Sequence, residues 1–338
     1  MKLIVQIPCF NEEATLPAVL AEIPRQIAGV DAVEVLVIDD GSTDRTGEVA
    51  RVGGADHVVR HRANRGLAAA FSTGLEACLG LGADVIVNTD GDNQYRGEAI
   101  PALIQPILEG RADIVVGDRR PASLPHFSPS KRLLQRLGSA VMRWLSRTDV
   151  PDAVSGFRAM SREAALDLNI VSSFSYTTDM LIQAGRKGMC VTAVTVPTNA
   201  VQRDSRLFAS SGDFVKRSAV SMLRAYSMYQ PLRVFLLIGS AAALLGLLPI
   251  VRFLYFFVAG QGEGHVQSLV LGGALLVIGF LTFVIGLLAD LVSFNRKLLE
   301  TIARDLRRHD LEEPHRAEPV AAEDREPLAT QPRWTSGG

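Results

Sequence analysis

The sequence lacks both the paired cysteines of a secreted disulfide framework and the charge excess of a nucleic-acid-binding protein. Only three cysteines occur in 338 residues, Cys9, Cys78 and Cys190, and they are scattered without the spacing of a metal site. An odd, dispersed set is typical of a reducing compartment, and we interpret all three as packing residues. The formal net charge is −1, so bulk electrostatics indicate no nucleic-acid partner.

Two stretches lack charge altogether. Residues 234–251 have no charged side chain over 18 positions, and residues 266–289 have none over 24. About 20 apolar residues in a helix cross the ~30 Å hydrocarbon core of a bilayer. We therefore predict a two-helix transmembrane hairpin over residues 232–297. Core helices of a soluble protein are the alternative, and the position of both stretches side by side next to a polar domain disfavours it.

The segment between the two stretches, AGQGEGH (residues 259–265), contains no Lys or Arg. Basic residues instead flank the outer ends: Lys216, Arg217, Arg224, Arg233, Arg296, Lys297, Arg304, Arg307 and Arg308. Because cytoplasmic loops carry the excess of Lys and Arg, we expect a multi-pass protein of the cell membrane with its N-terminal domain and both termini in the cytoplasm.

The first 120 residues alternate short β-rich runs with helical stretches. We predict strands at 3–8, 33–40, 56–61, 84–90 and 113–119, and helices at 11–27, 43–53, 66–82 and 98–110. Apolar strands separated by helices are typical of an α/β domain, with a mostly parallel sheet covered by helices on both faces. In such sheets ligands bind outside the carboxyl ends of the strands.

Three of the predicted strands end in polar clusters, PCFNEE, DDGSTD and DGDNQ. In the last cluster Asp90, Asp92 and Gln94 occupy alternate positions, which face the same side if the backbone is extended. Carboxylate and amide oxygens of this kind suit Mg²⁺ or Mn²⁺. The alternative is an ordinary turn, since Asp, Gly and Asn are turn residues.

The other two clusters offer acceptors for a nucleoside. Asp40 could accept hydrogen bonds from a nucleobase, and Glu12 from ribose hydroxyls or a base. Each also has a structural alternative: Glu12 in the first turn of a helix would stabilise the helix dipole, and the Asp40 segment could be a turn or an N-cap. Three such clusters at one sheet edge favour a binding site.

The remaining segments point to the membrane surface. Residues 119–148 contain seven basic and no acidic residues, and from residue 130 their apolar side chains recur at helical spacing. Such a helix is typical of membrane-surface binding, with an ordinary surface helix as the alternative. Residues 207–231 are predicted as a second interfacial helix region, and residues 298–338 as a helix end followed by a disordered cytoplasmic tail.

At this point the motifs PCFNEE, VLVIDDGSTDRT, NRG (64–66), DGDNQ and SGFR (155–158) together resemble the family 2 glycosyltransferases with a GT-A fold. With the C-terminal apolar pair, the chain is similar to the polyprenyl-phosphate glycosyltransferases of the dolichol-phosphate mannose synthase-like branch. The resemblance covers residues 4–206 and implies a catalytic domain at 1–206. The chain departs from the family pattern in three places. Phe10 stands in place of Tyr, Gly91 in place of the commoner Ala, and the stretch around Arg203 matches the usual Arg–Ser–Lys loop only loosely.

The resemblance implies an inverting transfer of one sugar from a UDP- or GDP-sugar to a polyprenyl phosphate. It implies that Pro8, Phe10, Glu12 and Asp40 surround the nucleoside and that Asp90, Gly91, Asp92 and Gln94 form the metal and diphosphate site. It further implies that Arg158, Arg203 and Arg206 lie near the diphosphate and the acceptor phosphate. Asp92, Arg158 and Asp179 are the candidate catalytic residues, with Asp179 either an orienting residue or a general base.

Two other readings of the chain remain open. One is a membrane scaffold that binds a nucleotide sugar without turning it over. The other is a glycosyltransferase whose acceptor is a sugar hydroxyl or another lipid. Small residues along the apolar stretches, Gly246, Gly272, Gly273, Gly279 and Gly286, could pack the two helices together or join subunits of a homo-oligomer.

Overall fold

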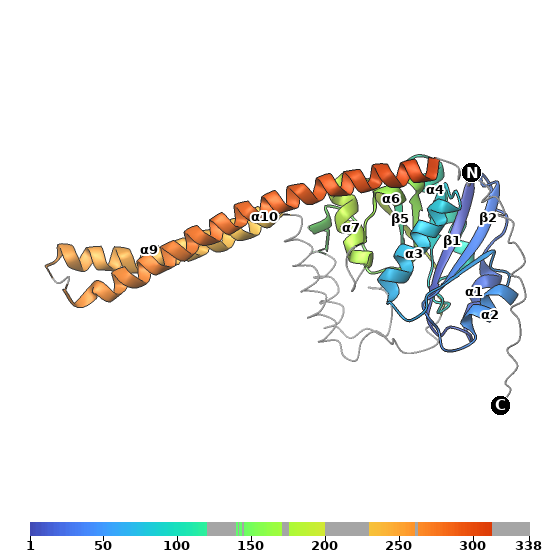
Figure 1. Ribbon diagram of the computed structural model, residues 1–338, viewed down its shortest axis with the longest axis horizontal. Helices are drawn as coiled ribbons and strands as arrows, with labels where there is room; N and C mark the ends of the chain where they lie inside the picture. The colour runs from blue at the N-terminus through green and yellow to red at the C-terminus, as the bar shows by residue number, and fades with distance from the viewer. Residues whose placement is uncertain are drawn as a thin grey trace, which may run out of the picture.

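The computed structural model describes residues 1–119, 140, 142–143, 145–170, 176–199, 230–260 and 263–312. The N-terminal domain contains seven strands in one mixed sheet and helices on both of its faces (Figure 1). In chain order its elements are β1 (Lys2–Cys9), α1 (Leu16–Glu22), β2 (Ala32–Asp39), α2 (Thr46–Val52), β3 (His57–Arg60), α3 (Leu67–Gly80), β4 (Val85–Asn88), α4 (Ile100–Leu108), β5 (Ile114–Asp118), β6 (Arg158–Ser161), α6 (Arg162–Asp167), α7 (Tyr176–Lys187) and β7 (Val191–Thr195).

The strand order β3-β2-β1-β4-β6-β5-β7 places a switch point between β1 and β4. The chain runs outward from β1 through β2 to β3 and then returns to the other side of β1 as β4. In open α/β sheets ligands bind at such a point, outside the carboxyl ends of the strands whose loops diverge there. The clusters PCFNEE and DGDNQ directly follow or end β1 and β4, so they lie at this point.

One strand departs from the parallel pattern. β6 lies antiparallel between β4 and β5, with Arg158 opposite both Asn88 and Val116. Because β6 begins where β4 ends, the SGFR segment reaches the same edge of the sheet as the DGDNQ cluster. The sheet is thus mixed at one position, and that position borders the site.

The core is divided by the sheet. One set of buried side chains packs α1 and α4 against the odd-numbered positions of β1, among them Leu3, Val5 and Ile7. The other packs α3, α6 and α7 against the opposite face around Ile4, Phe71 and Met180. Ring stacking between Phe71 and Tyr176, at 4.2 Å between centroids, joins α3 to α7.

Two helices after the domain, α9 (Pro231–Val258) and α10 (Val266–Glu312), are long and apolar enough to cross a membrane. They form a hairpin that projects away from the sheet domain (Figure 1). Glycine permits their close approach, because a methyl group at Gly239 would lie 2.9 Å from the Gly279 carbonyl oxygen, and one at Gly246 2.9 Å from that of Gly272. A methyl group at Gly286 would meet the side chain of Phe235, whereas one at Gly273 would meet nothing within 4 Å.

The described glycines of the apolar stretches other than Gly273 therefore lie at the contact between α9 and α10 within one chain. α10 continues without a break to Glu312, beyond the boundary at residue 297 expected for the hairpin, and its last part lies along the sheet domain (Figure 1). The expected interfacial helix at 207–231, most of the basic stretch at 119–148 and the tail after Glu312 lie outside the described residues.

Candidate active site

The metal-binding candidates lie in a turn directly after β4. The strand ends at Asn88, and Asn93 has the left-handed φ of 57°, so the alternate positions do not share an extended backbone as we expected. The turn is closed instead by the N–H of Gln94, which donates to Asp92 Oδ1 at 3.1 Å. These residues therefore form a turn, and the same turn carries the candidate metal-binding side chains.

A second segment holds this turn from the side. Asn199 donates its backbone N–H to the Gln94 carbonyl at 2.9 Å and its side-chain Nδ2 to the Asn93 carbonyl at 3.1 Å. Arg96 Nε donates in return to Asn199 Oδ1 at 3.0 Å. Because both backbone and side chain of Asn199 contribute, the turn is fixed at three points.

Asp90 faces Gly156 of the SGFR segment. A methyl group at Gly156 would lie 2.6 and 2.8 Å from the two carboxylate oxygens of Asp90, so only glycine leaves room for this carboxylate. Burial, followed by the nearby charge of Asp92, raises the pKa of Asp90 to about 7. A carboxylate held next to another one in an enclosed place favours a bound cation or a proton.

Gly156 is itself held on both sides. Its N–H donates to Tyr95 Oη at 3.1 Å, and its carbonyl accepts from Asn88 Nδ2 at 2.8 Å. Tyr95 stacks on Phe157 at 5.1 Å between ring centroids, and burial raises its pKa to about 12. The hydroxyl therefore stays protonated near neutral pH and serves as a fixed hydrogen-bonding group.

Arg158 is placed differently from our expectation that it binds the acceptor phosphate. Its side chain is fully buried, and burial lowers its pKa to about 10. Nε donates to the Ser155 carbonyl at 2.8 Å, Nη1 to that of Thr177 at 2.8 Å and Nη2 to that of Ala153 at 2.7 Å. In this arrangement Arg158 fixes the SGFR segment to the start of α7 and has no exposed surface with which to meet a lipid phosphate.

The cation at the edge of the site is Arg119, the residue after β5. It forms a two-point ion pair with buried Asp152, Nε to Oδ2 at 2.7 Å and Nη2 to Oδ1 at 3.0 Å. Nη1 donates to Gln94 Oε1 at 3.3 Å. Burial alone would lower the pKa of Arg119, but the hydrogen bonds to Asp152 raise it above its ordinary value. Its charge also acts on Asp90.

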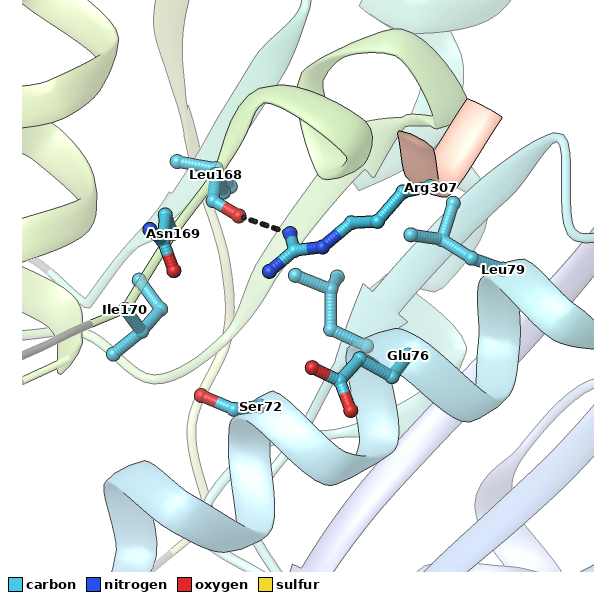
Figure 2. Close-up of a pocket in the computed structure, with 8 residues that line it drawn as sticks. Ser72, Glu76, Leu79, Leu168, Asn169, Ile170 and Arg307 are labelled. Carbon is cyan, nitrogen blue, oxygen red and sulfur yellow. Dashed lines mark hydrogen bonds between the residues drawn. The ribbon is translucent and has the colours of Figure 1, made fainter. Parts of the chain in front are cut away.

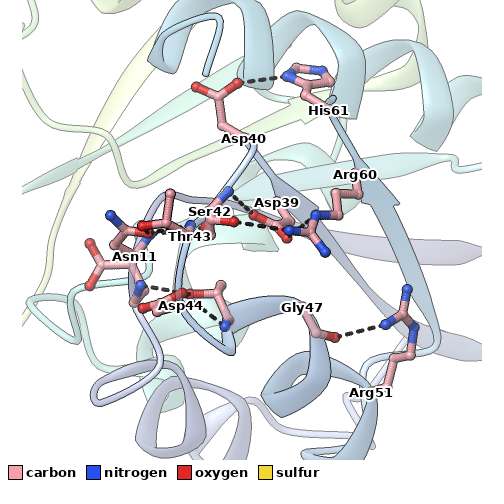
Figure 3. A network of polar contacts seen from close by, with 12 residues as sticks. Asn11, Asp39, Asp40, Ser42, Thr43, Asp44, Gly47, Arg51, Arg60 and His61 are labelled. Atoms are coloured by element: carbon pink, nitrogen blue, oxygen red, sulfur yellow. Dashed lines mark hydrogen bonds and ion pairs between the residues drawn. The ribbon is translucent and has the colours of Figure 1, made fainter. Parts of the chain in front are cut away.

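The loops after β1 and β2 are tied together beside this cluster (Figure 3). Asn11 N–H donates to Ser42 Oγ at 3.0 Å, and Glu12 N–H donates to Thr46 Oγ1 at 2.8 Å. α1 begins only at Leu16, so Glu12 precedes the helix and does not lie in its first turn, which removes the helix-dipole alternative. Glu12 packs instead against Gly91, where a methyl group would lie 3.3 Å from its Cγ.

Asp40 anchors the NRG segment. Its carboxylate accepts from the backbone N–H of Arg65 at 2.9 Å and of Gly66 at 2.8 Å. His61 Nδ1 lies 2.6 Å from the same carboxylate (Figure 3), and its Nε2 lies 3.0 Å from Thr73 Oγ1. Asp40 does not cap α2, whose N-cap is Arg45, and its contacts hold the NRG loop beside the end of β2.

The other expected site residues have these positions. Pro8 is buried near the end of β1, Phe10 follows it with 37% of its surface exposed, and Asp179 is buried in the first turn of α7. Arg203 and Arg206 lie outside the described residues. Within the described ranges, no group of three His, Cys, Asp or Glu side chains could hold a metal, so Asp90 and Asp92 would need Gln94, a ligand or water as further donors.

Sequence reasoning missed three residues of this site. Arg119 is the first residue of the basic stretch predicted for the membrane surface, although it directly follows an apolar strand, as the three acidic clusters do. His61 likewise follows β3 at the same edge of the sheet. Tyr95 was overlooked because its partners, Ser155 and Gly156, are some 60 positions away in the chain.

Comparison with known proteins places the sheet domain in a family. Residues 4–168 match the model of glycosyl transferase family 2. The undecaprenyl-phosphate mannosyltransferase of Micrococcus luteus is 29% identical over 66% of this chain and 93% of the relative. The polyprenol monophosphomannose synthase of Mycolicibacterium smegmatis is 30% identical over 64% of this chain and 83% of the relative.

Among solved structures, glucosyl-3-phosphoglycerate synthase from Mycobacterium tuberculosis, in complex with Mn²⁺, UDP-glucose and phosphoglyceric acid, matches 67% of this chain and 80% of its own. The TM-score is 0.54 at 24% identity, a likeness that concerns the fold alone. Taken with the strand-end clusters at the switch point of the sheet, the family match and the relatives show that this chain belongs to glycosyl transferase family 2 and is a glycosyltransferase.

Proposed function

We propose that this glycosyltransferase moves one sugar from a nucleotide diphosphate sugar to a polyprenyl phosphate, with inversion at the anomeric carbon. The observation that carries the proposal is the meeting of Asp90, Asp92 and Arg119 at the switch point of the sheet, in a chain with two helices apolar enough to cross a bilayer. The named activities of the Micrococcus and Mycolicibacterium relatives support the same acceptor class.

On the donor side, Asp90, Asp92 and Gln94 would hold Mg²⁺ or Mn²⁺. The fit rests on hard oxygen donors and on the raised pKa of Asp90, which a cation would reverse. When bound, the cation neutralises the diphosphate and stabilises it as a leaving group. The nucleoside would lie at the same edge of the sheet, beside the half-exposed Phe10 and the loops that Glu12 and Asp40 hold in place. The hydrogen bonds between the loops after β1 and β2 keep that edge rigid.

On the acceptor side, a phosphate oxygen attacks the anomeric carbon from the face opposite the diphosphate. The new C–O bond forms as the bond to the diphosphate oxygen breaks, and the nucleoside diphosphate leaves with the electron pair. A lipid monophosphate has its second pKa near ~6, so it is already an anion at neutral pH and needs no general base. The lipid phosphate needs a positively charged side chain nearby to approach a donor that is also an anion. Among the residues that the structure describes, Arg119 lies beside the proposed metal ligands, since it donates to Gln94 Oε1.

The test uses the full-length protein in lipid nanodiscs with a short-chain polyprenyl phosphate and a panel of radiolabelled UDP- and GDP-sugars. We expect label in the organic phase with one donor, with product lost on chelation and in Asp92→Asn. Binding of a donor without transfer would support the scaffold reading instead. Transfer that needs no polyprenyl phosphate would overturn the acceptor assignment.

A further inference from the structure

α10 has a second part that a simple membrane anchor does not need. The charge-free run ends at Ala289, yet the helix continues to Glu312. We name residues 290–312 the α10 extension. It lies along α6 and α7 on the outside of the sheet domain (Figure 1).

Ion pairs join the α10 extension to α6. Arg304 Nε lies 3.0 Å from Asp167 Oδ1, and Arg304 Nη2 lies 3.4 Å from Glu163 Oε2. Arg308 Nη2 lies 2.7 Å from Glu163 Oε1. On α7, Lys187 Nζ lies 3.8 Å from Glu300 Oε2. The spacing of these residues along α10, at intervals of four, puts them on one face of the helix.

Arg307 makes a further, partly buried contact of the extension. Its Nη1 donates to the carbonyl of Leu168, just after α6, at 3.3 Å (Figure 2). The guanidinium lies at a small cavity of about 60 Å³ whose other wall is α3, including Ser72 and Glu76. A carbonyl at the end of a helix has no partner within the helix, so a cation there is favourable.

The opposite face of the extension is apolar and exposed. Leu298, Ile302 and Leu306 have 50, 55 and 60% of their surface exposed. The α10 extension is therefore attached to the domain by charge pairs and a carbonyl contact more than by apolar burial. Exposed ion pairs are individually weak, but several that share one face act together.

The attachment links the apolar helices to the site through stiff elements. α10 contains no Gly or Pro after Gly286, so it has no built-in hinge between its apolar part and the extension. α7 carries Lys187 at one end, while at its other end the Thr177 carbonyl accepts from Arg158 of the SGFR segment. Docking of the extension thus orients the edge of the sheet that holds Asp90.

We propose that Arg304, Arg307 and Arg308 are positioning residues for the acceptor half of the reaction: their contacts with α6 hold the active-site edge at the height and angle at which a membrane-embedded phosphate reaches it. This inference rests on the proposed function. Binding of a soluble nucleotide sugar does not depend on that angle, so the contacts affect the lipid substrate selectively.

The experiment reverses the charges and then restores them. Full-length R304E/R308E in nanodiscs should raise the KM for polyprenyl phosphate about 5- to 30-fold, and leave the KM for the nucleotide sugar within about twofold. Adding E163R and D167R, which re-forms the pairs with opposite polarity, should restore the lipid KM. Asp305→Arg, a change at an exposed position of the same helical turn, serves as the matched control and should behave as wild type.

Hydrogen exchange supplies a readout independent of activity. Amides of residues 163–168 should exchange faster in R304E/R308E and recover in the fourfold variant. An unchanged lipid KM in a double variant whose α6 exchanges faster would overturn the inference, as would failure of the fourfold variant to restore that KM. Unchanged exchange would show that the extension is not docked. Absence of lipid product from the wild type would instead overturn the proposed function, whatever the exchange data show.

Discussion

Gly156 shows how one missing side chain can define a site. A methyl group here would collide with the Asp90 carboxylate, while Tyr95 and Asn88 hold the N–H and the carbonyl of Gly156. The residue therefore contributes space and has no chemical group of its own to offer. The SGFR motif needs glycine at this position because any side chain would occupy the space of the Asp90 carboxylate, and not because of the backbone conformation.

We expect Gly156→Ala to lower kcat/KM for transfer about 10- to 100-fold, because the methyl group must displace the carboxylate that we propose as a metal ligand. Mn²⁺ affinity, measured by calorimetry, should fall in parallel. Gly80→Ala is the control, since a methyl group at the end of α3 meets nothing within 4 Å. Equal activity of the two variants would contradict the packing argument.

Asp90 makes the stability of the metal-free protein depend on pH. Its pKa is raised from 3.8 to about 7, so the folded protein binds a proton that the unfolded chain releases. Stability from this group is therefore present at low pH and falls as pH rises through the window between those two values. A cation that binds the ionised carboxylate offsets the loss.

Addition of Mg²⁺ should therefore raise Tm more at pH 8 than at pH 5.5, by at least about 2–4 °C. Differential scanning fluorimetry with and without chelator measures the difference. Asp90→Asn should remove most of the metal-induced increase at both pH values. A shift of the same size at pH 5.5 and pH 8 would mean that Asp90 does not bind the ion.

Asp179 discriminates between the two acceptor classes. A polyprenyl phosphate is already ionised, so Asp179→Asn should retain activity within about tenfold and keep an acidic limb near pH ~6 in its rate profile. The profile of kcat/KM against pH, measured with a short-chain polyprenyl phosphate, gives the answer. An inactive variant without that limb would favour a general base and a hydroxyl acceptor.

At the scale of elements, all nine strands and helices predicted for residues 1–120 are present. The helices begin later than predicted, α1 at Leu16 and α4 at Ile100, because the polar residues before them form the loops of the site. The alternation of apolar strands with helices indicated which clusters share an edge, because the carboxyl ends of parallel strands coincide. The meeting of the three clusters at one sheet edge was therefore predictable from sequence.

The partners of the site residues were not predictable in the same way. β6 has only four residues, too short for a periodic signal, and it runs antiparallel among mainly parallel strands. The burial of Arg158 follows from this strand, since position 158 pairs inside the sheet with Asn88. An arginine in a motif next to a phosphate site favours a phosphate contact on chemistry alone, and only the three carbonyls around it indicate otherwise.

The glycine contacts between α9 and α10 predict a position-specific effect. Gly246→Leu should separate the two helices and lower the thermal stability of the protein in detergent, because its Cβ would lie 2.9 Å from the Gly272 carbonyl oxygen. Gly273→Leu is the matched control. Gly273 is next to Gly272 on α10, but a methyl group there would meet nothing within 4 Å, so the larger side chain should be tolerated. Equal loss of stability in both variants would point to contacts between separate chains.

At the scale of the whole molecule, the expected orientation is testable with the chain's own cysteines. Cys190 is exposed on the sheet domain, whereas Cys9 and Cys78 are buried. In intact cells, a membrane-impermeant thiol reagent should label Gly264→Cys in the connector between the helices and should leave Cys190 unlabelled until the membrane is opened. Labelling of Cys190 in intact cells would reverse the proposed topology.

The place of β6 between β4 and β5 also has a consequence for synthesis of the chain. β5 ends at Asp118 and β6 begins at Arg158, so about 40 residues must be added before the gap is filled, roughly 2–8 s at the usual rate of translation. During that interval β4 and β5 have no partner on their facing edges, and unpaired edges invite pairing with other chains. Once β6 has paired, β7, the last of the described strands, is complete at Thr195, before α9 has begun at Pro231. The order of elements thus lets the described sheet be completed before the two long apolar helices are synthesised.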